Sequence, residues 1–248
     1  ARLTNGVNSY DINTVTSDDK TDIEKLIADI DVLLGGDNLT PAERDSLEAL
    51  KALAKSLSER IEAAKSAAES PEITAVKGIT KDNAKLEDKD ALTKAKKAIE
   101  DALKTFGNNY TEEERKELEK QLDTVNEALE AIGNAEKVKD EIDKLPSPDN
   151  ITPDDKDAVD HVREAADNLS EEEKAILGKE ELSKIDALYL RISELEKQAA
   201  AADDTLPTSP RTGETDNIAM WMALLFVSGG LLTGMAVSDE KKKKRSVK

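Results

Sequence analysis

The chain has 248 residues, of which 36% are charged and only 2% aromatic, and its formal net charge is −18. This strong negative charge argues against a nucleic-acid-binding protein, which needs a basic surface to displace counterions. The absence of cysteine excludes disulfides, thiol catalysis and zinc–thiolate sites, and a single histidine, His161, excludes metal sites built from several histidines.

Residues 1–15 show no helical pattern, so we expect a linker or the last strand of an upstream domain. The chain starts at Ala1 without the basic, apolar and small-residue order of a signal peptide. We therefore expect it to be the C-terminal part of a longer precursor.

Two signals recur along residues 16–200. An Asp-Lys pair opens an apolar-periodic segment three times, at separations of 69 and 67 residues: Asp19-Lys20, Asp88-Lys89 and Asp155-Lys156. A later segment opens each time with a capping box, in which Thr or Ser precedes Glu by three residues: Thr40 and Glu43, Thr111 and Glu114, Ser170 and Glu173. This repetition predicts three related helical units.

The apolar spacing between these signals is helical, with steps of three and four residues that leave one narrow apolar face and one broad charged face. Such a helix cannot bury its face alone, so we expect an all-α fold of tandem small three-helix bundles. The predicted modules are 16–80, 81–147 and 148–200. Short third segments complete the first two modules, at Glu72–Ile79 and Ala135–Leu145, and the third has a shorter first helix and a second helix split around Gly178.

The residues that could carry chemistry favour a structural interpretation. His161 would need further metal ligands or a catalytic partner, and a solvated histidine explains it more simply. The acid pairs Asp18-Asp19 and Asp154-Asp155 lack the calcium-loop pattern and the aromatic cleft of a glycosidase, and acids at a helix start favour the macrodipole. We expect no catalytic residue, no metal and no cofactor.

The C-terminal region has three parts. Residues 201–217 form a tether, residues 218–237 contain no charge, and residues 238–248 form a basic tail with Lys241, Lys242, Lys243, Lys244 and Arg245. Twenty residues of helix span about 30 Å, the thickness of a bilayer core. We therefore predict a transmembrane helix with a cytoplasmic tail and with residues 1–217 outside. A buried core helix is the alternative.

The tether contains the pentapeptide Ser209, Pro210, Arg211, Thr212 and Gly213. With the apolar span and the basic tail that follow it, this order resembles the LPxTG-like sorting signal of Gram-positive cell-wall-anchored proteins, in an SPxTG variant. Leu206-Pro207 begins like the standard motif but lacks Thr-Gly in register. The alternative is a single-span membrane protein in which the pentapeptide is only a linker.

The resemblance implies that the chain is a substrate of a sortase. A cysteine of that enzyme would attack the carbonyl of Thr212, Gly213 would leave with the tail, and an amine of peptidoglycan would take its place. Ser209, Pro210 and Arg211 would serve recognition, and Lys241–Lys244 with Arg245 would retain the chain in the membrane before sorting. The expected location is the cell wall of a Gram-positive bacterium, and we expect no nucleic-acid partner.

The helical modules resemble repeats that precede the anchor in many large secreted enzymes and adhesins of such bacteria. This resemblance implies a stalk or spacer that is not itself an enzyme. Two alternatives stay open. The modules could bind a host protein, which the narrow apolar stripes and scarce aromatics do not support, or they could belong to the anchor region of a large secreted enzyme whose catalytic part lies upstream.

Overall fold

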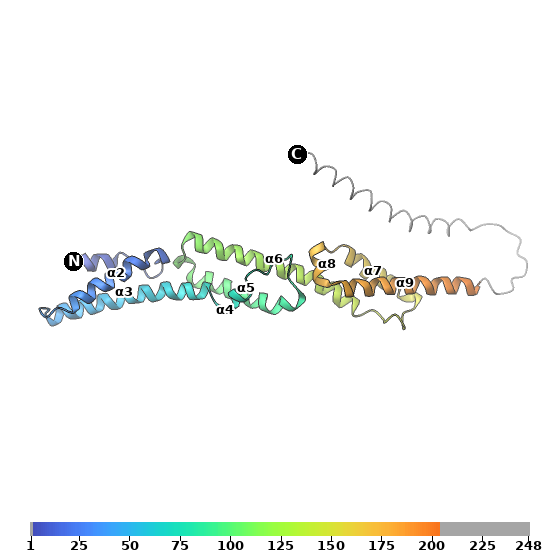
Figure 1. Ribbon diagram of the computed structural model, residues 1–248, viewed down its shortest axis with the longest axis horizontal. Coiled ribbons are helices and arrows are strands. Elements are labelled where there is room, and N and C mark those ends of the chain that lie inside the picture. The colour runs from blue at the N-terminus through green and yellow to red at the C-terminus, as the bar shows by residue number, and fades with distance from the viewer. Residues whose placement is uncertain (1, 204–248) are drawn as a thin grey trace, which may run out of the picture. The chain divides into compact units, whose positions relative to one another are not determined.

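The computed structural model describes residues 2–203, and the regular secondary structure among them is entirely helical, with no strand (Figure 1). This confirms the all-α class. The α-helices are α1 (Arg2–Asn8), α2 (Lys20–Leu34), α3 (Pro41–Ala68), α4 (Pro71–Ala75), α5 (Lys89–Phe106), α6 (Glu112–Ile142), α7 (Lys156–Asp167), α8 (Glu171–Leu177) and α9 (Lys179–Asp203). Four 3₁₀ turns join them: η1 (Ser17–Asp19), η2 (Leu86–Asp88), η3 (Gly107–Asn109) and η4 (Pro153–Asp155).

Three repeats follow one another, and each pairs a shorter first helix with a longer second one. We call them the first repeat (α2 and α3), the second repeat (α5 and α6) and the third repeat (α7, α8 and α9). In each, the residue three positions after the Asp-Lys lysine is completely buried in the first helix: Ile23, Leu92 and Val159, each 0% exposed. The apolar periodicity therefore corresponds to a real buried face.

The acid of each Asp-Lys pair caps the turn before the first helix. The carboxylate of Asp19 accepts a hydrogen bond from the backbone N–H of Thr16 at 2.9 Å, and Asp155 accepts one from Thr152 at 2.8 Å. Asp88 accepts from the N–H of Lys85 in the same way, at 2.9 Å. A local capping bond therefore explains why this aspartate recurs, in addition to the favourable macrodipole.

The lysine of each pair bridges to the second helix of its own repeat. Lys20 pairs with Glu62, Lys89 pairs with Glu136, and Lys156 pairs with Glu196 at 2.7 Å. Hydrogen bonding to the glutamate raises the pKa of Lys20 and of Lys156. Because these pairs are largely exposed, each contributes little stability and mainly marks the helix register.

The predicted capping boxes open the second helices and are confirmed. The backbone N–H groups of Glu43, Glu114 and Glu173 donate to the hydroxyls of Thr40, Thr111 and Ser170 at 3.2–3.3 Å. The glutamate carboxylates accept in return from the N–H of the capping residue. Hydrogen bonds from Thr40 hold the pKa of the Glu43 carboxyl below its ordinary value.

Each of the two long second helices packs against its own repeat and against the following one. Helix α3 has 28 residues and α6 has 31, so they are about 42 and 46 Å long. Ala64, near the end of α3, shares one apolar core with Ile99 of α5, and Ala135 of α6 shares that core with Leu177 of α8. The C-terminal part of each long helix therefore packs against the first helix of the following repeat.

This sharing changes two details of the sequence prediction. The segment Glu72–Ile79 was expected to complete the first module, but it contains α4, which packs against α5. The segment Ala135–Leu145 was expected to be a separate third helix, but α6 continues without a break through Gly133 to Ile142. Packing of the flanking apolar residues, Ile132 and Ala135 at 0% exposed, outweighs the low helix propensity of one glycine.

The prediction for residues 1–15 is wrong in its local structure. Residues Arg2–Asn8 form α1, which packs against α2 and α3 and buries Val7 completely. The helix is only seven residues long, too short to show an apolar period in the sequence. A turn follows in which the N–H of Val15 donates to the carbonyl of Asp11 at 2.8 Å, as Ala84 does to Thr80 and Ile151 to Ser147.

The third repeat has the predicted form. Helix α7 has only 12 residues, and Gly178 separates α8 from α9 with φ of 91° and ψ of 151°. This backbone conformation is essentially restricted to glycine, so Gly178 ends α8 by its own geometry.

The predicted tether beyond residue 203, transmembrane helix (218–237) and basic tail (238–248) lie outside the described residues. Among residues 2–203, no helix has both the length and the apolar character needed to cross a membrane.

Two glycine substitutions should change stability in opposite directions. Gly133→Ala should raise the free energy of unfolding by about 0.5–1 kcal/mol, because a Cβ at this helical position meets no atom within 4 Å. Gly178→Ala should lower it by about 1–3 kcal/mol, because alanine disfavours the positive φ. Urea denaturation followed by circular dichroism measures both, and equal effects would contradict the backbone argument.

Candidate functional site

The predicted sorting residues Ser209, Pro210, Arg211, Thr212 and Gly213 lie outside the described residues, as do the retention residues Lys241, Lys242, Lys243, Lys244 and Arg245. The described region therefore does not bear on their arrangement. The polar clusters of residues 2–203 lie where one repeat meets the next. We call these places the first and second junctions.

Asn109 lies at the centre of the first junction. It is 2% exposed, and its amide nitrogen donates to the carbonyls of Ile12 at 3.0 Å and Val15 at 2.9 Å. Its amide oxygen accepts from Nε of Arg60 at 2.9 Å. Asn109 thus joins the turn before α2, the long helix α3 and the turn before α6, and its buried polar atoms are satisfied.

Arg60 and Tyr110 complete this junction. The Arg60 guanidinium donates through Nη2 to the carbonyl of Thr105 at 2.7 Å and lies 4.4 Å from the centre of the Phe106 ring. The Tyr110 hydroxyl donates to the carbonyl of Ala64 at 2.9 Å. Burial, with a smaller contribution from the nearby Glu114 carboxylate, raises the pKa of Tyr110 to about 12.

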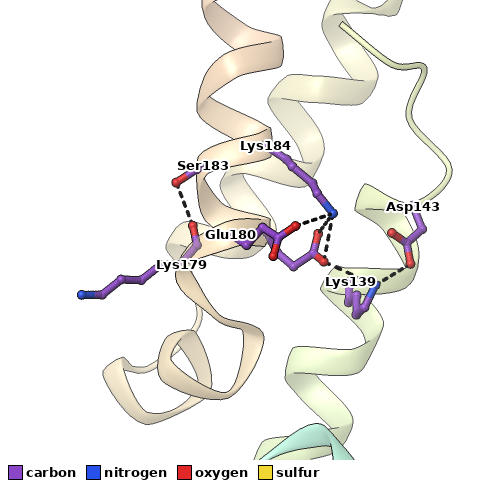
Figure 2. Close-up of polar contacts among 7 residues, drawn as sticks. Lys139, Asp143, Lys179, Glu180, Ser183 and Lys184 are labelled. Atoms are coloured by element: carbon purple, nitrogen blue, oxygen red, sulfur yellow. Dashed lines mark hydrogen bonds and ion pairs between the residues drawn. The ribbon is translucent and has the colours of Figure 1, made fainter.

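The second junction is a network of charges between α6 and α9 (Figure 2). Lys139 of α6 contacts Asp143 at 2.7 Å and reaches Glu181 of α9 at 3.5 Å. Lys184 contacts Glu181 at 3.0 Å. Hydrogen bonding between the partners raises the pKa of Lys139 and lowers that of Asp143. Asn134 of α6 adds a hydrogen bond to Glu173 of α8, at 2.7 Å.

The remaining candidate residues are dispersed. His161 is 73% exposed on α7, with Nε2 at 3.9 Å from a carboxylate oxygen of Glu141. Asp19 and Asp155 cap their turns, as described above. Across residues 2–203, no three His, Cys, Asp or Glu side chains gather as a metal-binding group. The polar clusters at the two junctions therefore serve to hold neighbouring helices in register.

A cavity of about 320 Å³ lies beside the second repeat, between α4 and α6. Its apolar lining includes Ile73, Ile99 and Val125, and both Glu117 and Lys120 border it. Because the bordering charges are of both signs, the cavity selects no class of ligand by charge.

The sequence contains a signal for the junctions that capping boxes alone do not reveal. Each capping residue is preceded by an asparagine and a large apolar residue: Asn38-Leu39-Thr40, Asn109-Tyr110-Thr111 and Asn168-Leu169-Ser170. Only Asn109 of these three asparagines is buried. In the second and third repeats the tripeptide lies where the preceding long helix packs. The local pattern does not indicate Arg60, the long-range partner of Asn109.

Removing the Asn109 side chain should loosen the first junction. Asn109→Ala should lower the free energy of unfolding by about 1–3 kcal/mol, because it removes the donor to the part-buried Ile12 carbonyl and the buried Val15 carbonyl, and the acceptor of Nε of Arg60. Asn38→Ala is the matched control at the same repeat position, and it should change stability by less than about 0.5 kcal/mol because Asn38 is exposed. Similar decreases in the free energy of unfolding for both variants would show that the long-range hydrogen bonds of Asn109 add no stability.

Tyr110 should make the stability of the protein fall at alkaline pH. Its folded-state pKa of about 12 exceeds the ordinary value of 10.0, so the unfolded chain loses this proton first and stability falls as pH rises from about 10 to about 12. Tyr110→Phe should therefore show a smaller loss of stability between these pH values than the unmodified chain. Urea midpoints at pH 9 and pH 11.5 measure the difference, and parallel losses would contradict it.

Comparison with known proteins does not indicate a family or a function for this chain. No protein-family model, curated protein or solved structure matches the chain. Its function is therefore inferred from its own residues and helices.

Proposed function

We propose that the chain is the non-catalytic stalk of a cell-wall-anchored surface protein of a Gram-positive bacterium. A sortase cleaves it between Thr212 and Gly213 and joins Thr212 to peptidoglycan. The repeats of residues 16–200 act as a spacer, and the segment 218–237 spans the membrane until the chain is sorted.

One observation carries the proposal: three elements occur in the order that anchoring requires. The pentapeptide Ser209–Gly213 comes first, the uncharged segment 218–237 follows after four residues, and the basic group Lys241–Arg245 comes last. A pentapeptide alone is a weak signal because it is short. The apolar segment and the basic group supply the membrane retention without which the enzyme would have little time to find its substrate.

The sortase reaction gives Thr212, Gly213 and Pro210 distinct roles. The cysteine thiolate of the sortase attacks the Thr212 carbonyl carbon, the bond to the Gly213 nitrogen breaks, and that nitrogen takes up a proton and leaves with the tail. An amine of peptidoglycan then attacks the thioester, which forms an amide to Thr212 and releases the thiolate. Pro210 restricts φ and lowers the entropy cost of presenting an extended peptide.

Charge supports the role of a spacer. Residues 213–248 hold six of the 36 basic residues and four of the 54 acidic residues, so residues 1–212 carry 30 basic and 50 acidic residues, a net charge of −20. Such a surface repels copies of itself and stays hydrated.

The helix arrangement supports the same role. Because α3 packs against α5 and α6 packs against α7 and α8, consecutive repeats are held together by shared helix packing as well as by the turns that connect them. A spacer built in this way holds its two ends apart at little cost in chain length.

Substitution of the acyl donor should abolish anchoring. We expect Thr212→Ala to reduce the amount of chain released from cell walls by a muralytic enzyme at least tenfold, because the scissile bond no longer presents the recognised residue. Thr208→Ala, four residues earlier and outside the pentapeptide, is the matched control and should leave the amount unchanged. Immunoblotting of wall, membrane and medium fractions measures the distribution.

Mass spectrometry of the released chain identifies the bond. The expected C-terminal peptide ends at Thr212 and bears a peptidoglycan fragment. An intact C-terminus through Lys248, recovered only from detergent-extracted membranes, would contradict the proposal and indicate a permanent single-span membrane protein.

A further inference from the structure

The three repeats share a surface at the end where the first helix meets the second. It includes the apolar residue before each capping residue, Leu39, Tyr110 or Leu169, and the leucine seven positions after the capping residue, Leu47, Leu118 or Leu177. In the first and second repeats it also includes the residue thirteen positions after the Asp-Lys lysine, Leu33 or Ala102.

This surface is covered in the second and third repeats. Tyr110 is 7% exposed and Leu118 is 4% exposed in the second repeat, and Leu169 and Leu177 are 9% and 3% exposed in the third. Helix α3 packs against α5, and α6 packs against α8, so each repeat receives the end of the preceding long helix here. The surface is therefore an established interface between consecutive repeats.

The same surface is open in the first repeat. Leu33 is 46% exposed, whereas its counterpart Ala102 is 3% exposed in α5. Leu39 and Leu47 are only half-buried. We call these three leucines the open end of the first repeat.

Helix α1 leads toward the open end. It packs on α2 and α3, much as α4 packs on α5, and the turn that follows it has the same hydrogen bonds as the turn that follows α4. Along the long axis of the first repeat, α1 begins on the side of the α2–α3 turn (Figure 1). A helix placed ahead of α1 would therefore approach the open end directly.

We propose that the open end binds the last part of the long helix of another repeat of this kind, joined to the chain through α1. The proposal rests on the continuity of one interface through the repeats, and it is independent of wall anchoring. The last part of α3, residues 57–68, is the reference for this occupant.

Residues 57–68 of α3 show which chemistry the open end would recognise. Ala64, Ala67 and Ala68 are small and allow close approach of another helix. Arg60 of this segment donates to Asn109 in the second repeat. Asn38 occupies the corresponding position in the first repeat and is exposed, so it can accept the equivalent bond from an incoming arginine.

A duplicated chain tests the proposal. In it, residues 1–79 are followed directly by residues 11–248, so that the second copy of the first repeat has an α3 and an α4 ahead of it. Because the chain contains no cysteine, a single Leu33→Cys in that copy reports exposure through its rate of maleimide labelling. Val32→Cys is the matched control, because Val32 is 77% exposed and its counterpart Asp101 is also exposed.

The original and duplicated chains are compared at full length in detergent micelles. We expect labelling of Leu33→Cys to slow at least tenfold on duplication, with Val32→Cys unchanged, and Arg60→Ala in the added copy to restore part of the rate. Equal labelling of Leu33→Cys in both chains would overturn the proposal. Concentration-dependent protection in the original chain would also overturn it, because the occupant would then be a second copy of the whole chain.

Discussion

The narrow apolar stripe on each helix is the constraint from which the rest of the architecture follows. A helix with one such stripe needs two neighbours to cover it, and the first helices are too short to cover a long second helix along its whole length. The long helices α3 and α6 therefore each pack against the first helices of two consecutive repeats, α3 against α2 and α5, and α6 against α5 and α7. The polar junctions lie at these crossings, where Asn109 and Lys139 hold the shared helix against the repeat that it enters.

The sequence predicted what depends on local chemistry. The helical stripes, the capping boxes at Thr40, Thr111 and Ser170, and the break at Gly178 all follow from interactions within a few residues. It did not predict that α4 packs against α5, because periodicity tells which face of a helix is apolar but not which neighbour covers it. It also did not predict that α6 continues through Gly133, whose cost of about 1 kcal/mol in a helix is smaller than the gain from packing around it.

The candidate sites divide in the same way. The sorting signal was inferred from the order of short linear elements, which needs no tertiary structure, and it stays a prediction. The junction of Arg60 with Asn109 joins residues 49 positions apart, and no local pattern specifies that pair. The Asp-Lys repeat was recognised as a pattern, and the structure supplies its physical meaning: the aspartate caps a turn and the lysine reaches the second helix.

The sharing of long helices also bears on the order in which the repeats can fold. The core around Ile99 includes Ala64 from α3, so the second repeat cannot complete its core before the end of the preceding helix has formed. Among residues 2–203, the main helix contacts lie within one repeat or between adjacent repeats, so the array resembles a quasi-one-dimensional one, with stability that is a sum of repeat and interface terms. A chain of this design can acquire structure sequentially, one repeat providing the template for the next, while the remainder is still unfolded.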